Sequence, residues 1–180
     1  MLLVVDNGSI YTKQLTYFLG KKGILFEKQA SQYLDLNLLT NYNSFILSGR
    51  RKNEKKINEI NSKIIKHCVK NNVKLLGICY GAEILALTLG GTIRKTSFVQ
   101  KGIESIQTSK ENLICNGYLD VFESHAFEIS RLPSVLMPLA DSKNCKYEII
   151  QYEKKSIFGT QFHPEMSQDG NDLIEKFCSL

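Results

Sequence analysis

A cysteine flanked by glycines is the first feature of this sequence that could carry chemistry. Cys79 stands in Leu75-Leu76-Gly77-Ile78-Cys79-Tyr80-Gly81, between a strand-like apolar run and a helix-like run. Glycines two residues before and two after the central residue are needed where a strand turns sharply into a helix, because side chains there would collide. A thiol at such an elbow is exposed, and the helix dipole favours its thiolate. The spacing predicts a nucleophile; the alternative is a buried structural cysteine, the usual state of a free thiol.

A cysteine nucleophile needs a base, and the chain has three histidines that could supply one. His163 is favoured because a proline and then Glu165 follow it. Proline biases its predecessor toward extended backbone, in which residues two apart face the same side. Glu165 can then hold one imidazole nitrogen while the other faces the Cys79 thiol. His67 is expected on a helix surface, and His125 on a loop after a strand.

The composition is that of an ordinary globular domain. The chain has 180 residues, a formal net charge of +5, 43% hydrophobic residues and 23% charged residues, so we expect one domain over residues 1–180. Five scattered cysteines without a Cys-x-x-Cys pair predict reduced thiols and no metal site, and no cofactor motif is present. The basic run Arg50–Lys56 is typical of a solvated loop rather than a nucleic-acid surface. Since no apolar run reaches membrane-spanning or signal length, we expect a cytoplasmic protein without nucleic-acid or membrane partners.

Alternating strand and helix patterns must position these residues. Up to about residue 90, strands are predicted at 2–5, 24–27, 44–47 and 73–78, and helices around 11–19, at 54–71 and at 82–89. This alternation predicts an α/β fold with right-handed crossovers and a parallel sheet. Beyond Gly90-Gly91, short strands near 103–108, 118–122, 146–152 and 156–162, with a helix near 170–178, predict hairpins that extend the sheet.

Taken together, the motifs resemble those of class I glutamine amidotransferases. The elbow Gly77–Gly81 and the segment Gly159–Glu165 are similar to the paired signatures of that family. Further landmarks follow in family order and span nearly the whole chain: Val4–Ser9, Ile46–Gly49, Leu89–Gly91 and Glu123–His125. The opening Asp-Asn-Gly-Ser and the Cys-Tyr-Gly elbow are most similar to the amidotransferase component of GMP synthetase.

The resemblance implies a flavodoxin-like, doubly wound, mostly parallel sheet with helices on both faces. It also implies a triad of Cys79, His163 and Glu165. In such a triad the thiolate attacks the side-chain carbonyl of glutamine, ammonia leaves with a proton from the histidine, and water cleaves the glutamyl thioester. The family's oxyanion donors correspond to the backbone groups of Gly49 and Tyr80.

Two positions depart from the family pattern. The family's Ser-Gly-Gly-Pro is here Ser48-Gly49-Arg50-Arg51. If the second glycine needs a positive φ, Arg50 is strained there, and the oxyanion hole forms only when a partner reshapes the loop. Glu83 stands where the elbow motif has glutamine. A carboxylate there changes how the polar groups of the substrate are held, or raises the pKa of the Cys79 thiol by like-charge repulsion.

Three functional hypotheses follow from the resemblance. The first is a glutaminase subunit of purine biosynthesis that feeds ammonia to a separate synthetase of the ATP-pyrophosphatase type, as in GMP synthesis; aminodeoxychorismate and anthranilate synthesis are alternative destinations. The second is a partner-independent γ-glutamyl hydrolase, and the third a catalytically impaired regulatory or scaffolding homologue. Ser124 and His125 resemble a pair beside the glutamine pocket, and with Glu83 they are the predicted substrate-binding residues. Because Ala126-Phe127 replace the Gly-Asp that follows in the family, GMP-specific coupling is the weakest part of this prediction.

Overall fold

The computed structural model describes residues 1–180. Its strands are β1 (Leu2–Asn7), β2 (Phe26–Ala30), β3 (Ser44–Arg50), β4 (Lys74–Ile78), β5 (Thr92–Thr108), β6 (Tyr118–Arg131), β7 (Leu136–Asp141), β8 (Ile149–Tyr152) and β9 (Ile157–Thr160). Its α-helices are α1 (Thr12–Lys21), α2 (Lys55–Asn71), α3 (Tyr80–Thr88) and α4 (Gln168–Ser179), and 3-10 helices occupy Ser31–Tyr33, Leu36–Asn41 and Pro164–Met166. None of the helices is long and apolar enough to cross a membrane.

All nine strands form one curled sheet in the order β2-β1-β3-β4-β9-β8-β7-β5-β6. The first five strands of this order pair in parallel. The last four are joined to them and to one another by antiparallel pairing. The predicted α/β fold, with a parallel core and hairpin additions in the C-terminal half, is therefore confirmed.

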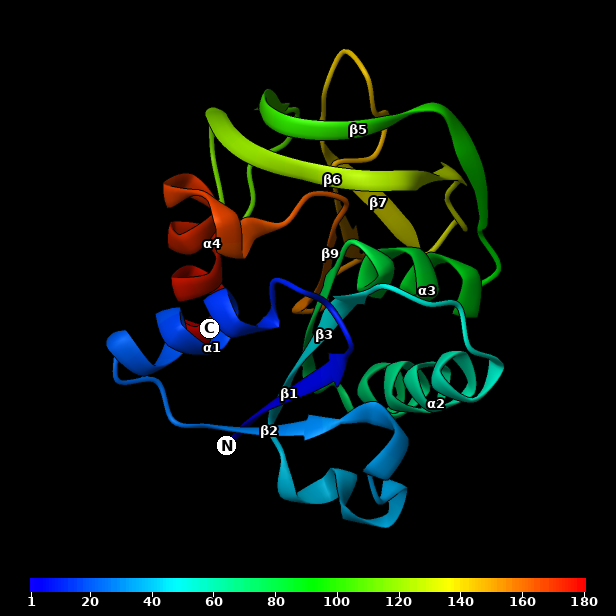
Figure 1. Cartoon of the computed structure of the whole chain (residues 1–180), viewed down its shortest axis with the longest axis vertical. Helices are drawn as coiled ribbons and strands as arrows, with labels where there is room; N and C mark the ends of the chain where they lie inside the picture. The colour runs from blue at the N-terminus through cyan, green and yellow to red at the C-terminus, as the bar shows by residue number, and fades with distance from the viewer.

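Helices cover both faces of the parallel part of the sheet (Figure 1): α1 and α4 lie together on one face, and α2 and α3 on the other. Because successive side chains of a strand point to opposite faces, β1 contributes to both cores. Leu2 and Val4 pack with α1 and α4, whereas Leu3 and Val5 pack with α2 and α3. This two-sided burial is why β1 reads as an unbroken apolar run.

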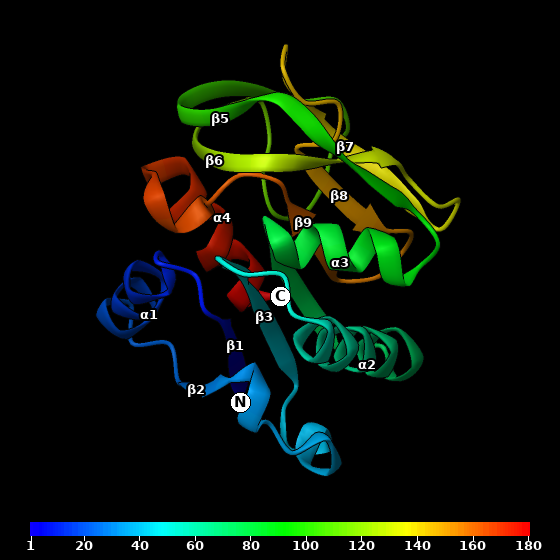
Figure 2. The same cartoon turned by 45° about the vertical axis from the view of Figure 1, so that its right-hand side comes forward.

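The C-terminal half differs from the sequence expectation in its strand lengths. β5 and β6 have 17 and 14 residues, where short strands were expected, and together they curve over the end of the sheet (Figure 2). β7 was not predicted at all. Much of β5 is polar and exposed, so apolar periodicity does not reveal it. A bulge between Lys95 and Gln100 further interrupts its pairing with β6.

Candidate active site

The turn at Cys79 is as tight as the glycine spacing predicted. β4 ends at Ile78 and α3 begins at Tyr80, leaving Cys79 with a φ of 50°, a conformation that non-glycine residues rarely adopt. A Cβ on Gly77 would lie 2.4 Å from the carbonyl oxygen of Gly81, and one on Gly81 would lie 2.5 Å from the carbonyl oxygen of Leu47. Neither position can accept a side chain without moving the backbone.

The Cys79 thiol differs from the sequence expectation, because it is buried rather than exposed. The residue is 8% exposed, and its backbone N–H donates to the carbonyl oxygen of Thr160 at 2.7 Å. Burial raises the pKa of the thiol well above its usual range, and the charge of Glu83 raises it further. The backbone N–H of Tyr80 acts in the opposite direction and lowers the pKa. Burial therefore works against a thiolate at this helix N-terminus.

His163 and Glu165 form the buried pair that the sequence predicted. Nδ1 of His163 lies 2.9 Å from Oε1 of Glu165, and the side chains are 4% and 1% exposed. The backbone N–H of His163 donates to the carbonyl oxygen of Phe122 in β6. Because β9 pairs directly with β4, the segment after β9 arrives beside the segment after β4. Adjacent strands thus bring the histidine and the cysteine to the same edge of the sheet.

Gly49 packs against the His163 ring. A Cβ on Gly49 would lie 2.9 Å from Cε1 of His163, so the backbone and the imidazole are in close contact. The side chain of Ser48 accepts from the N–H of Asn7 at 2.9 Å, and Asn7 donates from its side chain to the carbonyl oxygen of Ser48 at 3.0 Å. Asn61 of α2 exchanges hydrogen bonds with the Asn7 amide. This buried network holds the end of β3 in place.

Arg50 is not strained, because it continues β3 and does not have a positive φ. The expectation of strain there is wrong, since the chain reaches Arg51 without a left-handed turn. The Arg50 guanidinium lies 4.0 Å from the ring centroid of Tyr80 and donates at 2.8 Å to Asn58. The Tyr80 hydroxyl donates to the same Asn58 oxygen at 2.9 Å. Arg50 therefore ties the predicted oxyanion loop to the first residue of α3.

Glu83 is a buried carboxyl one turn after Cys79. It is 5% exposed, and Nε2 of Gln161 lies 3.4 Å from its Oε1. Burial raises the pKa of Glu83; the Gln161 hydrogen bond and then the positive charges nearby, from Arg50 in β3 and from two histidine side chains, oppose that rise. Its charge acts on the Cys79 thiol in the predicted direction, toward a higher pKa.

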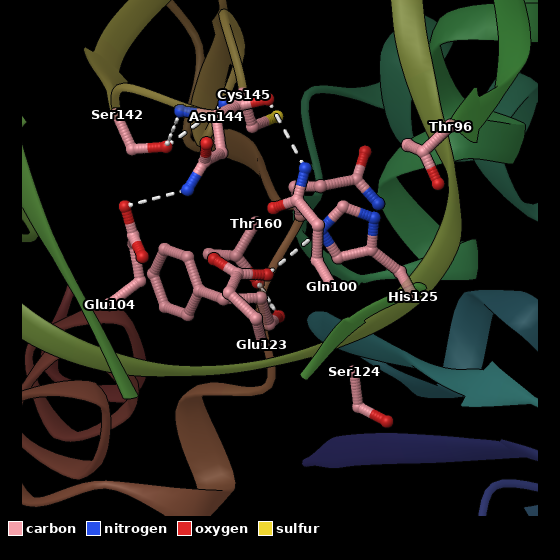
Figure 3. Close-up of polar contacts among 12 residues, drawn as sticks. Thr96, Gln100, Glu104, Glu123, Ser124, His125, Ser142, Asn144, Cys145 and Thr160 are labelled. Carbon is pink, nitrogen blue, oxygen red and sulfur yellow. Dashed lines mark hydrogen bonds and ion pairs between the residues drawn. The ribbon is translucent and has the colours of Figure 1, made fainter. Parts of the chain in front are cut away.

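Ser124 and His125 point to opposite sides of β6, as Figure 3 shows. His125 is directed inward, and each of its ring nitrogens already faces an acceptor of the protein. The Ser124 hydroxyl accepts from the hydroxyl of Tyr11 at 3.2 Å. The Tyr11 ring in turn packs against that of His163, with ring centroids 4.5 Å apart. The two predicted substrate-binding residues therefore have different surroundings.

Two further residues of the site escaped sequence reasoning. Gln161 bridges Glu83 and the carbonyl oxygen of Phe127; its place in the Gly159–Glu165 motif was the available signal. Tyr11 precedes α1 and contacts His163, and nothing in its local sequence marks it, because the contact exists only after α1 packs beside the segment that follows β9.

Neither Cys79 nor His163 lines any of five cavities at the protein surface. One of these, of about 590 Å³, is lined by residues of the β1 and β2 ends and of the segment before α2. No group of three or more histidine, cysteine or acidic side chains could hold a metal ion.

Comparison with known proteins agrees with this architecture. The sequence profile of the family described as glutamine amidotransferase class-I matches residues 3–179. The chain is 29% identical to a subunit of the glutamine-hydrolyzing GMP synthase of Pyrococcus furiosus, an alignment that covers all of this chain and 98% of that one. It is 26% identical to the longer, glutamine-hydrolyzing GMP synthase of Cronobacter sakazakii, over 98% of this chain and 36% of that enzyme.

Solved structures give the same answer. A protein described as a candidate GMP synthase subunit, from Thermoplasma acidophilum, superposes with a TM-score of 0.87 at 27% identity, covering 99% of this chain and 92% of that one. A glutamine amidotransferase from Thermotoga maritima shares the fold, with a TM-score of 0.77 at 18% identity, over 97% of this chain and 80% of that one. With an elbow cysteine, a buried histidine–glutamate pair and a family match over nearly its whole length, the chain belongs to the class I glutamine amidotransferase family, and it is similar to the amidotransferase subunits of GMP synthase.

Proposed function

We propose that this chain hydrolyses glutamine to glutamate and ammonia through Cys79, His163 and Glu165, and that it delivers the ammonia to a separate synthetase subunit of the GMP synthase type. The observation that supports this most directly is the His163–Glu165 pair, buried at 2.9 Å beside the strained elbow at Cys79. A buried, oriented imidazole next to an elbow thiol is the arrangement that nucleophilic acyl transfer requires.

In the first half of the reaction, the thiol proton passes to His163 as the sulfur attacks the side-chain carbonyl of glutamine. Because burial raises the pKa of the Cys79 thiol, attack and proton transfer are expected to be coupled rather than to start from a resting thiolate. The charge of Glu165 stabilises the imidazolium that forms. Collapse of the tetrahedral intermediate breaks the C–N bond, and His163 gives its proton to the leaving ammonia.

In the second half, His163 takes a proton from water, and the resulting hydroxide attacks the glutamyl thioester. The C–S bond breaks, and the proton returns to the sulfur of Cys79. Both tetrahedral intermediates place negative charge on the former carbonyl oxygen. The backbone N–H groups of Gly49 and Tyr80 are the proposed donors to this oxygen, each contributing roughly 3 kcal/mol to barrier lowering.

The substrate's amino acid end is assigned to a pocket wall formed by Glu83 and Ser124, with His125 behind it. The carboxyl of Glu83 is an acceptor for the α-ammonium group of glutamine, a role in which a carboxylate can replace the family's glutamine. Ser124 reaches the site through Tyr11, whose ring packs on His163. His125 is buried behind this wall and contributes its charge rather than a free hydrogen-bonding atom.

Two relatives support the delivery of ammonia to a partner. One is named as a subunit of a GMP synthase, and the other is a longer GMP synthase, of which the aligned part is only 36%. Cys79 and His163 are only 8% and 3% exposed, which fits a site that opens when a synthetase docks. GMP synthesis is proposed from these relatives as the destination of the ammonia.

Glutamate release from glutamine tests the proposal, with the parent chain compared with Cys79→Ala, alone and with an ATP-pyrophosphatase partner of the GMP synthase type. We expect release by the parent to rise when the partner and its substrates are present, and to vanish in Cys79→Ala. Equal release by the two proteins would refute the catalytic assignment.

Two controls separate the alternatives. Partner-independent hydrolysis of γ-glutamyl amides larger than glutamine would favour the γ-glutamyl hydrolase. Failure of Cys79 to be alkylated by a glutamine-like chloroketone, together with no glutamate release under any condition, would favour the regulatory homologue.

A further inference from the structure

A second carboxyl–imidazole pair, formed by two residues of β6, is buried in the protein (Figure 3). Oε2 of Glu123 lies 2.9 Å from Nε2 of His125, and the two side chains are 3% and 1% exposed. The other ring nitrogen, Nδ1, lies 2.8 Å from the carbonyl oxygen of Phe127. Nε2 makes no aligned hydrogen bond, so its contact with Glu123 is an ion-pair distance and not a hydrogen bond. A carboxylate and a carbonyl are both acceptors, and a proton on each ring nitrogen suits both contacts.

A further buried carboxyl, that of Glu148, adjoins Glu123. Glu148 is fully buried, and apart from the His125 contact no hydrogen bond satisfies the carboxyl oxygens of the two glutamates. Burial and then the charge of Glu123 raise the pKa of Glu148 well above its usual range; Glu104 adds to the rise, and the Ser142 hydroxyl opposes it. The raised pKa favours the neutral form of Glu148. The carboxyl that contacts His125 is that of Glu123.

Polar groups link this cluster to the wall of the proposed glutamine pocket. The Phe127 carbonyl that faces His125 also accepts from Nε2 of Gln161 at 3.3 Å, and the same nitrogen lies 3.4 Å from Oε1 of Glu83. Burial raises the pKa of Glu83 and so favours its neutral form, whereas the charge of His125 lowers that pKa. Burial alone would lower the pKa of His125, but Glu123, the Phe127 carbonyl and Glu83 raise it, and the net direction is upward.

We propose that Glu123 is a positioning residue: its carboxyl, 2.9 Å from the His125 ring, holds that ring as a cation linked through Gln161 to Glu83, so that Glu83 keeps its negative charge for the ammonium group of the substrate. This inference rests on the proposed function, in which Glu83 contacts glutamine. A buried carboxylate needs a compensating charge while the pocket is empty, and in this chain a carboxylate stands where the family has a neutral glutamine. Neither Glu123 nor Glu148 touches the substrate.

The protonation of His125 can be measured directly, without turnover. The chain has three histidines, so the ring-nitrogen resonances of ¹⁵N-histidine-labelled protein can be assigned with His67→Gln and His125→Gln. At pH 7 we expect the parent to show His125 with both nitrogens protonated, and Glu123→Gln to show the neutral ring. Glu148→Gln changes a buried carboxyl that does not contact His125, and is expected to keep the cation. A neutral His125 in the parent would overturn the proposal.

Kinetics test the link to Glu83. Glu123→Gln is expected to raise KM for glutamine roughly tenfold with kcat within threefold, because a charge partner of a substrate-binding group is lost while the triad is intact. In a Glu83→Gln background the same change is expected to alter KM less than twofold. An equal effect in both backgrounds would show a purely structural role. Exposed Glu153→Gln, whose side chain has no partner, is the matched control, and thermal unfolding of each variant reports folding.

The two arms separate the two proposals. Absence of glutamine hydrolysis in every variant counts against the proposed function, and the resonances still decide the charge of His125. Hydrolysis by the parent with a neutral His125 at pH 7 counts against this inference alone.

Discussion

Gly49 lies against the His163 ring, and this contact makes a sharp prediction for Gly49→Ala. The added Cβ would lie 2.9 Å from Cε1 of His163 and 3.4 Å from Oγ of Ser9. Ordinary van der Waals contact begins near 3.4 Å, so the imidazole must move by about 0.5 Å. Gly49 does not have a positive φ, so alanine fits the backbone, and its N–H is retained. The substitution therefore displaces the base while leaving the proposed oxyanion donor present.

Displacement of a catalytic group by 1 Å can cost about a hundredfold in rate, so a shift of about half that is expected to lower kcat for glutamine hydrolysis roughly tenfold. The assay is steady-state glutamate release with the synthetase partner present. Gly20→Ala in α1 is the matched control, because nothing lies within 4 Å of its added Cβ and its φ is not positive; it is expected to leave kcat unchanged. An unchanged kcat in Gly49→Ala, with both variants folded, would refute the placement of His163 against the loop.

Three further outcomes are expected. Gly77→Ala puts a Cβ 2.4 Å from a backbone oxygen of α3 and is expected to cost about 3 kcal/mol of stability, seen as a fall of roughly 6–12 °C in Tm; a Tm within 2 °C of the parent would contradict the elbow geometry. Glu83→Gln removes a charge that raises the pKa of the Cys79 thiol, so the pH midpoint for alkylation by iodoacetamide is expected to move down, and an upward shift would contradict this. The pKa of His125 is raised in the folded state, so its stabilising contribution is complete below the unfolded pKa of about 6.5 and is lost as pH rises through the folded value; urea unfolding is expected to show the parent's advantage over Glu123→Gln shrinking from pH 6 to pH 9, and a growing advantage would reverse the sign.

The strands of the parallel half could be predicted from the sequence because they are buried on both faces. Runs such as Phe45-Ile46-Leu47 have no polar interruption, and such runs mark strands with helices above and below. β5 could not be predicted in the same way, since most of its residues are polar and few of them are buried. Its partner is β6, and only the pairing of the two defines its length.

The elbow at Cys79 and the His163–Glu165 pair could be predicted for a different reason, because each depends on residues that are close together in the sequence. Two glycines at fixed offsets allow the close approach at Cys79. Glu165 lies beside His163 as predicted, but a 3-10 helix over Pro164–Met166 places it there and not the extended backbone that the sequence predicted. The exposure of the thiol was predicted wrongly, because burial depends on what packs over the turn. Glu83 and Glu123 reach the Cys79 sulfur as charges from separate elements.

The amino acid sequence by itself determined the chemical groups available and the short-range geometry that holds them: the nucleophile at a strained turn, the base with its carboxylate, and the order of strands and helices. Only the tertiary structure decided the electrostatics, which depend on distances between side chains that are remote in sequence. The tertiary structure buries the Cys79 thiol, which raises its pKa, and it packs Tyr11 against the His163 ring. It also places Glu123, His125 and Gln161 in one series of polar contacts. Charge interactions strengthen as water is excluded, and the exclusion of water is a property of the whole packed chain.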